Sequence, residues 1–479
     1  MVKLNISENK YNNLLGSEKI FKTISIVAGK IDQKVFVIGG YVRDLILNRT
    51  TKDIDIVTLG SGIELAKKTA EVLNSSTVKV FKSFGTAMIK IGDLEVQFVG
   101  ARKESYRNDS RNPIVENGTI EEDQIRRDFT INALAISLNK GNYGAFIDPF
   151  NGIKDLKEKR LKTPLDPNIT FSDDPLRIMR AIRFSSQLDF EIENQTLAAI
   201  KKNVDRIKIV AQERITDELN KIILSNQPSK GFKLMEETGL LKLIFPEFQL
   251  LKGVEIKDGK SHKDNFYHTL KVLDNILPYS KGNLWLRWAA ILHDIAKPNT
   301  KRFNTKQGWT FHGHEDKGAR MVPSIFRKLK LPLDNSMKYV QKLVLLHLRP
   351  ISLTNKSITD SALRRLLFEA GEDLEDLMTL CQSDITSKNK DKKIKFINRF
   401  ENVKIKLRDL EDRDKIKNWQ PPIDGKEIME TFNIKPCKEV GILKESIKNA
   451  ILDGIIKNTY KEAYDYLLVK AKEIGIIEK

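Results

Sequence analysis

The chain has 479 residues, with 82 Lys and Arg against 64 Asp and Glu and a formal net charge of +18 at pH 7. Apolar residues make up 40% of the chain, enough for a sizeable core, and its length predicts about three domains. The charge indicates a polyanionic partner, although a solvated lysine-rich surface explains it equally well. Cys381 and Cys437 lie far apart, so the sequence indicates neither a disulfide framework nor a cysteine-based zinc site. Because no apolar signal segment opens the chain and no run approaches the ~18 residues of a membrane span, we expect a soluble cytoplasmic protein without membrane contact.

A strand, a glycine turn, a helix and a second strand are predicted after a lead-in helix in residues 1–34. A β-branched run over 35–38 stops at Gly39 and Gly40, a helix-like segment covers 41–47, and an alternating strand begins at Asp53. Two glycines at a strand end let the backbone approach a ligand closely, and the helix N-terminus beyond them offers free N–H groups to a phosphate.

Asp53 and Asp55 stand two residues apart in the second strand. Both carboxylates therefore leave one face of the strand, while Ile54 and Ile56 enter the core. Neighbouring carboxylates repel each other unless a cation lies between them, which indicates an Mg²⁺ site for a nucleoside triphosphate. For an isolated Asp-Ile-Asp the alternative is a solvent-facing strand edge.

A helix over 62–73 and short strands over 78–81, 86–91 and 94–99 are predicted next. Gly92 and Asp93 indicate a hairpin turn, so that Glu95 begins an antiparallel strand within reach of the carboxylate face. Glu95 is the candidate third acidic group, and a surface glutamate is the alternative. The polar segment over 102–121 favours a mobile loop.

Two further segments combine cationic and hydrogen-bonding side chains. Arg126, Arg127, Asp128 and Asn132 are of the types that a ribose and triphosphate pocket needs, with guanidinium for phosphate and carboxylate or amide for hydroxyls. Downstream, Asp174 suits the N-cap and Pro175 the first position of a helix. Arg177, Arg180 and Arg183 recur every three residues and share one side of this helix, which also fits a solvated basic face.

These segments resemble the polymerase β-type nucleotidyltransferase superfamily, in the form carried by bacterial CCA-adding tRNA nucleotidyltransferases and poly(A) polymerases. Gly-Gly-x-Val-Arg-Asp with Asp-x-Asp, at Gly39, Gly40, Arg43, Asp44, Asp53 and Asp55, matches the family's first motif, and 126–133 matches its second. The resemblance implies that Asp53 and Asp55 are catalytic and hold Mg²⁺, and that the remaining residues of both motifs bind nucleotide. Glu95 is added to the catalytic candidates as the third acidic group.

The segment Asp173 to Arg177 resembles the family's base-reading motif, with Asp173 in place of the more usual Glu. A carboxylate accepts from the exocyclic amine of C or A while a guanidinium donates to a ring acceptor, so Asp174 and Arg177 would select these bases and reject G and U. Arg180 and Arg183 are further nucleotide-binding candidates. The segment 212–221 matches the family's last motif, which is expected to hold the base-reading helix in place.

All six histidines fall between His262 and His347, a confinement that indicates a metal site. The spacing resembles the HD phosphohydrolase superfamily, whose His…His-Asp…Asp skeleton is filled by His268, His293, Asp294 and Asp384. His314 and His347 stand where a second metal's ligands occur in some members. The resemblance implies an Mn²⁺, Ni²⁺ or Mg²⁺ site. The alternative is a degenerate helical domain that only binds RNA.

Together these observations predict an α+β protein, a nucleotidyltransferase head with a mixed sheet followed by an all-α body. The predicted parts are the head (1–160), a base-recognition and tRNA-binding helical domain (161–250), an HD-type metal-binding domain (251–395) and a helical tail (396–479). The resemblance implies template-independent addition of C, C and A to tRNA from CTP and ATP, with no obligatory protein partner. A poly(A) polymerase, an A-only or CC-only enzyme, and a non-catalytic RNA-binding protein remain open.

Overall fold

A computed structural model of the chain describes residues 18–74, 78–82, 85–107, 110–354, 359–386, 389–417 and 419–476. The chain forms two compact units, Met1–Ile244 and Phe245–Lys479, called here the N-terminal and C-terminal units. The finer division into four domains stays a prediction. The helix expected in 1–34 is described from residue 18 onward, where α2 covers Glu18–Lys30.

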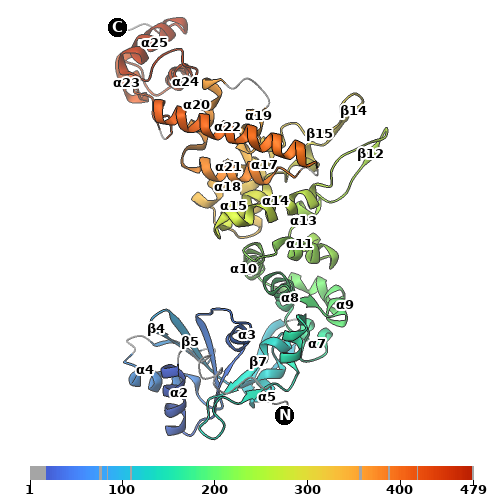
Figure 1. Cartoon of the computed structure of the whole chain (residues 1–479). Helices are drawn as coiled ribbons and strands as arrows, with labels where there is room; N and C mark the ends of the chain where they lie inside the picture. The colour runs from blue at the N-terminus through green and yellow to red at the C-terminus, as the bar shows by residue number, and fades with distance from the viewer. Residues whose placement is uncertain are drawn as a thin grey trace. The chain divides into compact units, whose positions relative to one another are not determined.

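A seven-stranded mixed sheet forms the core of the N-terminal unit (Figure 1). Its strand order is β3-β4-β5-β2-β1-β8-β9, and its only parallel pair among the described residues is β2 with β5. The strands are β1 (Val35–Ile38), β2 (Asp53–Thr58), β3 (Val78–Phe81), β4 (Thr86–Ile91), β5 (Leu94–Gly100), β8 (Ala135–Ser137) and β9 (Phe146–Ile147).

The strands predicted over 35–38, 53 onward, 78–81, 86–91 and 94–99 are thus confirmed. All four residues of β1 are buried, as a central strand requires, and β2 alternates so that Ile54 and Ile56 are buried beneath the two aspartates. The helix α3 (Gly40–Ile46) joins β1 to β2, and α4 (Gly62–Val72) lies beside α2 and packs on β4 and β5.

The segment 102–121 is not a loop, contrary to the expectation from its polar composition. β6 (Arg102–Arg107) and β7 (Ser110–Asn117) form an antiparallel hairpin, and α5 (Ile120–Ile125) follows it. A two-stranded ribbon pairs its backbone groups without a buried face, so the apolar alternation that marks a core strand is missing from the sequence. Asn108 and Asp109, which belong to the segment expected to be a loop, lie outside the described residues.

A layer of helices completes the N-terminal unit. The expected helix start near Pro175 is confirmed to within one residue, because α8 begins at Leu176 and the Asp174 carboxylate accepts a hydrogen bond from the Leu176 N–H at 3.2 Å. α8 packs against α10 and α11. The elements are α6 (Gly152–Lys157), α7 (Pro167–Asp173), α8 (Leu176–Leu188), α9 (Asn194–Asn203), α10 (Gln212–Ile223), α11 (Pro228–Glu237) and α12 (Leu240–Ile244), with the short strands β10 (Arg160–Leu161) and β11 (Glu191–Ile192).

The C-terminal unit is built from helices around an aromatic core that includes Phe245, Phe248 and Trp288, and no described helix is both long and apolar enough to cross a membrane. Two small hairpins, β12/β13 (Ile256–Lys257 and Lys260–Ser261) and β14/β15 (Arg302–Asn304 and Gly308–Thr310), extend from it (Figure 1). The helices are α13 (Pro246–Gln249), α14 (Asn265–Ser280), α15 (Leu284–Leu292), α16 (Lys297–Thr300), α17 (His314–Lys328), α18 (Asn335–Leu346), α19 (Arg349–Ser352), α20 (Asp360–Ala370), α21 (Leu374–Ser383), α22 (Lys390–Asp414), α23 (Gly425–Phe432), α24 (Lys438–Leu452) and α25 (Tyr460–Glu473). The α+β class, a mixed-sheet head followed by a helical body, is confirmed.

Candidate functional site

A cleft of about 670 Å³ in the N-terminal unit brings together residues from distant parts of the sequence. They come from the glycine turn and α3, from β2, from the segment after α5, and from α8. The predicted site residues on its wall are Gly40, Arg43, Asp44, Asp53, Asp55, Arg126, Arg127, Asp128, Asn132, Arg177, Arg180 and Arg183. Cations and carboxylates dominate this wall, which suits an anionic ligand held with a divalent cation.

Asp53 and Asp55 form the acidic edge of the cleft. Burial raises the pKa of Asp55, and Asp53 raises it further, against the lowering effect of Arg127. Gly39 lies beside Asp55 and has a φ of +84°. A Cβ at this position would lie 2.8 Å from Arg127 Nη1 and 3.4 Å from Asp55 Oδ2. Only glycine fits this approach. The two carboxylates repel each other when both are ionised. A divalent cation bound between them would remove this repulsion.

A hydrogen-bonded network links the motifs along the wall of the cleft. Arg43 Nη1 donates to Asn132 Oδ1 at 2.8 Å, and Asn132 Nδ2 donates to Asp128 Oδ1 at 3.0 Å. Asp128 Oδ2 then accepts from Arg180 Nε at 2.7 Å. Burial alone would raise the pKa of Asp128, but Arg180, with Asn132 and Arg177, lowers it to about 2. Asp128 therefore orients Asn132 and Arg180 as a permanent anion.

Asp123 is a site residue that the sequence reasoning missed. Its side chain is fully buried on α5, where Oδ1 accepts from Arg126 Nε at 3.0 Å and Oδ2 from Arg127 Nη2 at 3.1 Å. Burial alone would raise the pKa of Asp123, but the charges and hydrogen bonds of Arg127 and Arg126 outweigh burial and hold this pKa below its usual value. The signal available in the sequence was the spacing, because an acid three and four residues before two arginines shares their helix face.

The base-reading candidates differ in their surroundings. Arg177 is on the cleft wall and its Nη2 donates to the Arg126 carbonyl at 2.7 Å, whereas Asp174 is not among the lining residues. Arg183 pairs with the buried Glu218 of α10 at 2.6 Å, so α10 contacts the arginine-bearing helix as expected. Phe184, which the sequence reasoning passed over, lines the cleft and lies under the guanidinium of Arg43 at 4.9 Å.

Glu95 lies directly beside Asp53 in the sheet, because the two residues are register partners of β5 and β2. The expected hairpin is present, with Ile91 opposite Leu94, but β5 runs parallel to β2. Glu95 is exposed and is not among the residues lining the cleft.

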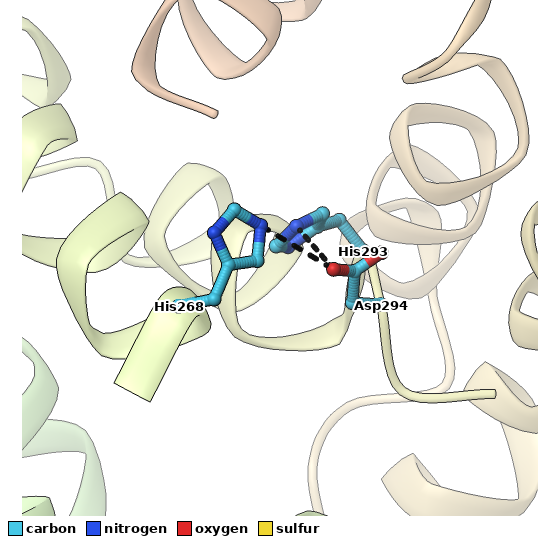
Figure 2. A group of neighbouring side chains, drawn as sticks. All are labelled: His268, His293 and Asp294. Carbon is cyan, nitrogen blue, oxygen red and sulfur yellow. Dashed lines mark ion pairs between the residues drawn. The ribbon is translucent and has the colours of Figure 1, made fainter. Parts of the chain in front are cut away.

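A second cluster lies inside the C-terminal unit and contains the predicted HD residues. Figure 2 shows three of them, His268, His293 and Asp294. Asp294 Oδ2 is 3.4 Å from His268 Nε2 and 3.2 Å from His293 Nε2, and Asp384 Oδ1 is 2.9 Å from His268 Nε2. The other oxygen, Asp294 Oδ1, faces His314 Nε2 at 3.2 Å and His347 Nε2 at 4.0 Å. Asp294 thus belongs to two groups of candidate ligands, one with His268 and His293 and one with His314 and His347. Within each group the ligand atoms lie within 4.8 Å of one another.

The histidines of this cluster are oriented as metal ligands. His293, His314 and His347 each direct Nδ1 at a backbone carbonyl, at 2.7 to 2.8 Å, and His268 Nδ1 lies 3.0 Å from the Thr386 hydroxyl. The Nε2 atoms of His293, His314 and His347 are buried without a hydrogen-bond partner. Buried lone pairs facing carboxylates, with Nδ1 fixed behind them, fit one or two divalent metal ions.

Electrostatics in the cluster favour a cation between the carboxylates. Burial alone would lower the pKa of His293, but Asp294 and Asp384 raise it to about 10. Burial, together with His293, lowers the pKa of His347 to about 4. Lys297 Nζ donates to Asp294 Oδ2 at 2.6 Å. The exposed His312 and the half-buried His262 are not part of either ligand group.

Three protein-family models match successive parts of the chain. The poly A polymerase head domain matches residues 35–162, and the probable RNA and SrmB-binding site of polymerase A matches 189–251. The HD domain matches residues 265–387, which contain both ligand groups of the second cluster.

Relatives match over most of the chain. The A-adding tRNA nucleotidyltransferase of Aquifex aeolicus (strain VF5) is 31% identical over 72% of this chain, which spans only 44% of that protein. The tRNA nucleotidyltransferase cca2 of Schizosaccharomyces pombe is 30% identical, with 94% of each chain covered. The CC-adding tRNA nucleotidyltransferase of Thermus thermophilus is 27% identical, with 90% and 93% covered. The solved Thermotoga maritima CCA-adding enzyme complexed with tRNA-CCA shares the fold, with a TM-score of 0.60, 21% identity, and 96% of this chain and 98% of that chain covered.

Proposed function

This chain belongs to the tRNA nucleotidyltransferase family, and from that premise we propose that it adds C, C and A to the 3′ end of tRNA from CTP and ATP. The convergence of Asp53 and Asp55 with seven arginines in one cleft is the observation that carries the proposal. Nucleotidyl transfer requires this combination, because the triphosphate needs cationic partners and the attacking 3′-hydroxyl needs a metal ion nearby.

Asp53 and Asp55 are proposed to hold Mg²⁺, with Glu95 as a third acidic group. Mg²⁺ held there would lower the pKa of the 3′-hydroxyl and would stabilise the in-line displacement of pyrophosphate. Gly39, Gly40 and Arg43 would hold the triphosphate against the N-terminus of α3. Arg126 and Arg127 are proposed to contact phosphates, while Asp128 and Asn132 contact the sugar.

Base choice is assigned to Asp174 and Arg177. Arg177→Ala or Asp174→Ala is expected to relax the ratio of C or A to U or G incorporated, because each removes half of a base contact worth ~1–3 kcal/mol of discrimination. The ratio is measured on a tRNA that lacks its 3′ terminus, with Lys201→Ala on α9 as the control. An unchanged ratio with a uniform loss of rate would show that these residues support α8 instead of reading bases.

Asp123 supplies a prediction that the structure alone suggests. Asp123→Asn removes the anion that holds Arg126 and Arg127, and charge-assisted hydrogen bonds contribute ~1.5–3 kcal/mol each, so the KM for CTP and ATP is expected to rise about tenfold or more. Glu121→Gln, an exposed acid on the same helix, is the matched control. Equal KM values in wild type and Asp123→Asn would contradict the positioning role.

The number of nucleotides added is tested with tRNA transcripts that end before the first C, after one C and after two Cs, each with single labelled nucleotides. Full CCA addition extends all three. Relatives named A-adding and CC-adding define the alternatives, in which only the last transcript or only the first two are extended. Long A tails on unrelated RNA would instead indicate a poly(A) polymerase.

For the second cluster we propose a metal-dependent phosphohydrolase that acts on 2′,3′-cyclic phosphates or 2′-phosphates at RNA ends. The buried, partnerless Nε2 atoms around Asp294 support the proposal. His268, His293, Asp294 and Asp384 would hold Mn²⁺, Ni²⁺ or Mg²⁺, which would supply an activated water for attack on phosphorus. A 2′,3′-cyclic phosphate occupies the 3′ oxygen that nucleotide addition needs, and a 2′-phosphate crowds the neighbouring 3′-hydroxyl, which would connect the two activities. The alternative is a helical tRNA-binding scaffold without hydrolytic activity.

A further inference from the structure

Two hairpins of the C-terminal unit are joined into one projection, called here the hairpin arm (residues 252–263 and 301–311). Trp309 Nε1 on β15 donates to the Lys260 carbonyl on β13 at 3.2 Å. Lys260 Nζ in turn donates to the carbonyls of Thr305 and Lys306 at 2.6 and 2.9 Å. These bonds tie the β12/β13 hairpin to the β14/β15 hairpin, so the arm has a defined surface of its own.

A row of aromatic rings runs along the arm, called here the aromatic row (Phe303, Trp309, His262 and Phe311). Successive ring centroids are 5.2 Å apart for Phe303 and Trp309, 5.5 Å for Trp309 and His262, and 5.7 Å for His262 and Phe311. All four residues are half-buried. They therefore keep part of their surface in contact with solvent, unlike aromatic residues in a hydrophobic core.

Lysine ammonium groups accompany the aromatic row. Lys257 lies 5.0 Å from the Phe303 ring, Lys301 lies 5.2 Å from the Trp309 ring, and Lys297 lies 5.7 Å from the Phe311 ring. Lys297 is also the residue that donates to the metal-cluster carboxylate Asp294 at 2.6 Å. Lys297 thus contacts both the last ring of the aromatic row, Phe311, and the metal cluster, so the row and the cluster are adjacent.

A cleft of about 190 Å³ lies where the arm meets the helices, and its lining includes His262 and Phe311 of the row together with Asn265 and Pro298. Asn265 is three residues before His268 on α14, and Pro298 follows Lys297, so the cleft adjoins the metal cluster. The arm carries seven Lys and Arg against two acidic residues. Its charge therefore complements a polyanion.

We propose that the hairpin arm binds a single-stranded RNA end and guides its terminal phosphate to the metal cluster. Base-on-ring stacking with nearby cations is how proteins hold single strands without reading their sequence. The proposal rests on the phosphohydrolase function and names its substrate class, an RNA terminus in preference to a free cyclic nucleotide. An acidic protein segment would use the lysines but not a continuous row of rings, so RNA is favoured.

Trp309 reports on this surface directly. An RNA single strand of about 12 nucleotides, added to the full chain without metal, is expected to quench tryptophan fluorescence as bases stack on the indole. Trp309→Phe should remove the RNA-dependent quench, whereas Trp285→Phe, outside the arm, should retain it. A quench that survives in Trp309→Phe, or that polyglutamate reproduces fully, would overturn the proposal.

Hydrolysis provides the second measurement. In the metal-loaded full chain, Trp309→Ala and Lys257→Glu are expected to lower kcat/KM for RNA ending in a 2′,3′-cyclic phosphate by roughly 5- to 100-fold, the effect of losing one stacked base. Activity on 2′,3′-cyclic AMP should stay at the wild-type level, as should RNA hydrolysis in the controls Tyr279→Ala and Lys338→Glu. Equal losses on both substrates would overturn the guiding role. If wild type hydrolyses neither substrate, the phosphohydrolase assignment fails, while the metal-free quench still decides whether the arm binds RNA.

Discussion

Asp53→Ala and Asp55→Ala are each expected to lower nucleotide incorporation about a thousandfold or more, because a bound cation contributes several kcal/mol of transition-state stabilisation. Affinity for tRNA should stay close to wild type, since Lys and Arg contacts to phosphates dominate that affinity. The measurements are single-turnover incorporation of labelled CTP or ATP and titration of labelled tRNA in the same buffer.

Two further variants make this test specific. Glu71→Gln removes an exposed acid from α4 of the same unit and should leave incorporation unchanged. Glu95→Ala tests whether Glu95, the register partner of Asp53, is a metal ligand. Loss of a metal ligand would lower the rate strongly, whereas loss of a surface glutamate would not. Incorporation within tenfold of wild type in Asp53→Ala or Asp55→Ala would contradict the assignment of the carboxylate pair.

Short-range periodicity explains which features could be predicted. Asp53 and Asp55 share a face because strand side chains alternate, and Arg177, Arg180 and Arg183 share a side of α8 because of helical spacing. Both facts depend only on local geometry. The glycine turn was equally local, since Gly39 adopts φ +84° and leaves no space for a Cβ beside Arg127.

Long-range pairing explains what the sequence could not reveal. The β6/β7 hairpin carries no apolar alternation, so only the paired backbone identifies it. The lysines and aromatic residues of 252–263 and 301–311 lie in separate parts of the sequence, and only the hydrogen bond between Trp309 and Lys260 shows that they form one surface. The division of Asp294 between two histidine pairs depends on where four helices place their ends, which no spacing rule specifies.

If each ligand group holds one ion, Asp294→Ala is expected to empty both positions, because the two carboxylate oxygens of Asp294 face different histidine pairs. His347→Ala removes a ligand from one group only and should retain about half of the metal bound by wild type. The measurement is metal content per chain after loading with Mn²⁺ and removal of free ions. Equal metal content in wild type and Asp294→Ala would contradict the two-group arrangement.

The double variant His293→Ala with Asp294→Ala is expected to abolish phosphohydrolase activity and to leave CCA addition intact, since the two clusters lie in different compact units. His312→Gln, an exposed histidine two residues before a proposed ligand, is the matched control and should keep both metal content and hydrolysis. If wild type loaded with Mg²⁺, Mn²⁺ or Ni²⁺ cleaves neither 2′,3′-cyclic AMP nor a 2′-phosphorylated nucleotide, the hydrolytic function is wrong. Metal bound in the absence of hydrolysis would then hold α14, α15, α17, α18 and α21 together as a scaffold, and its removal by a chelator should lower the thermal unfolding temperature of the C-terminal unit.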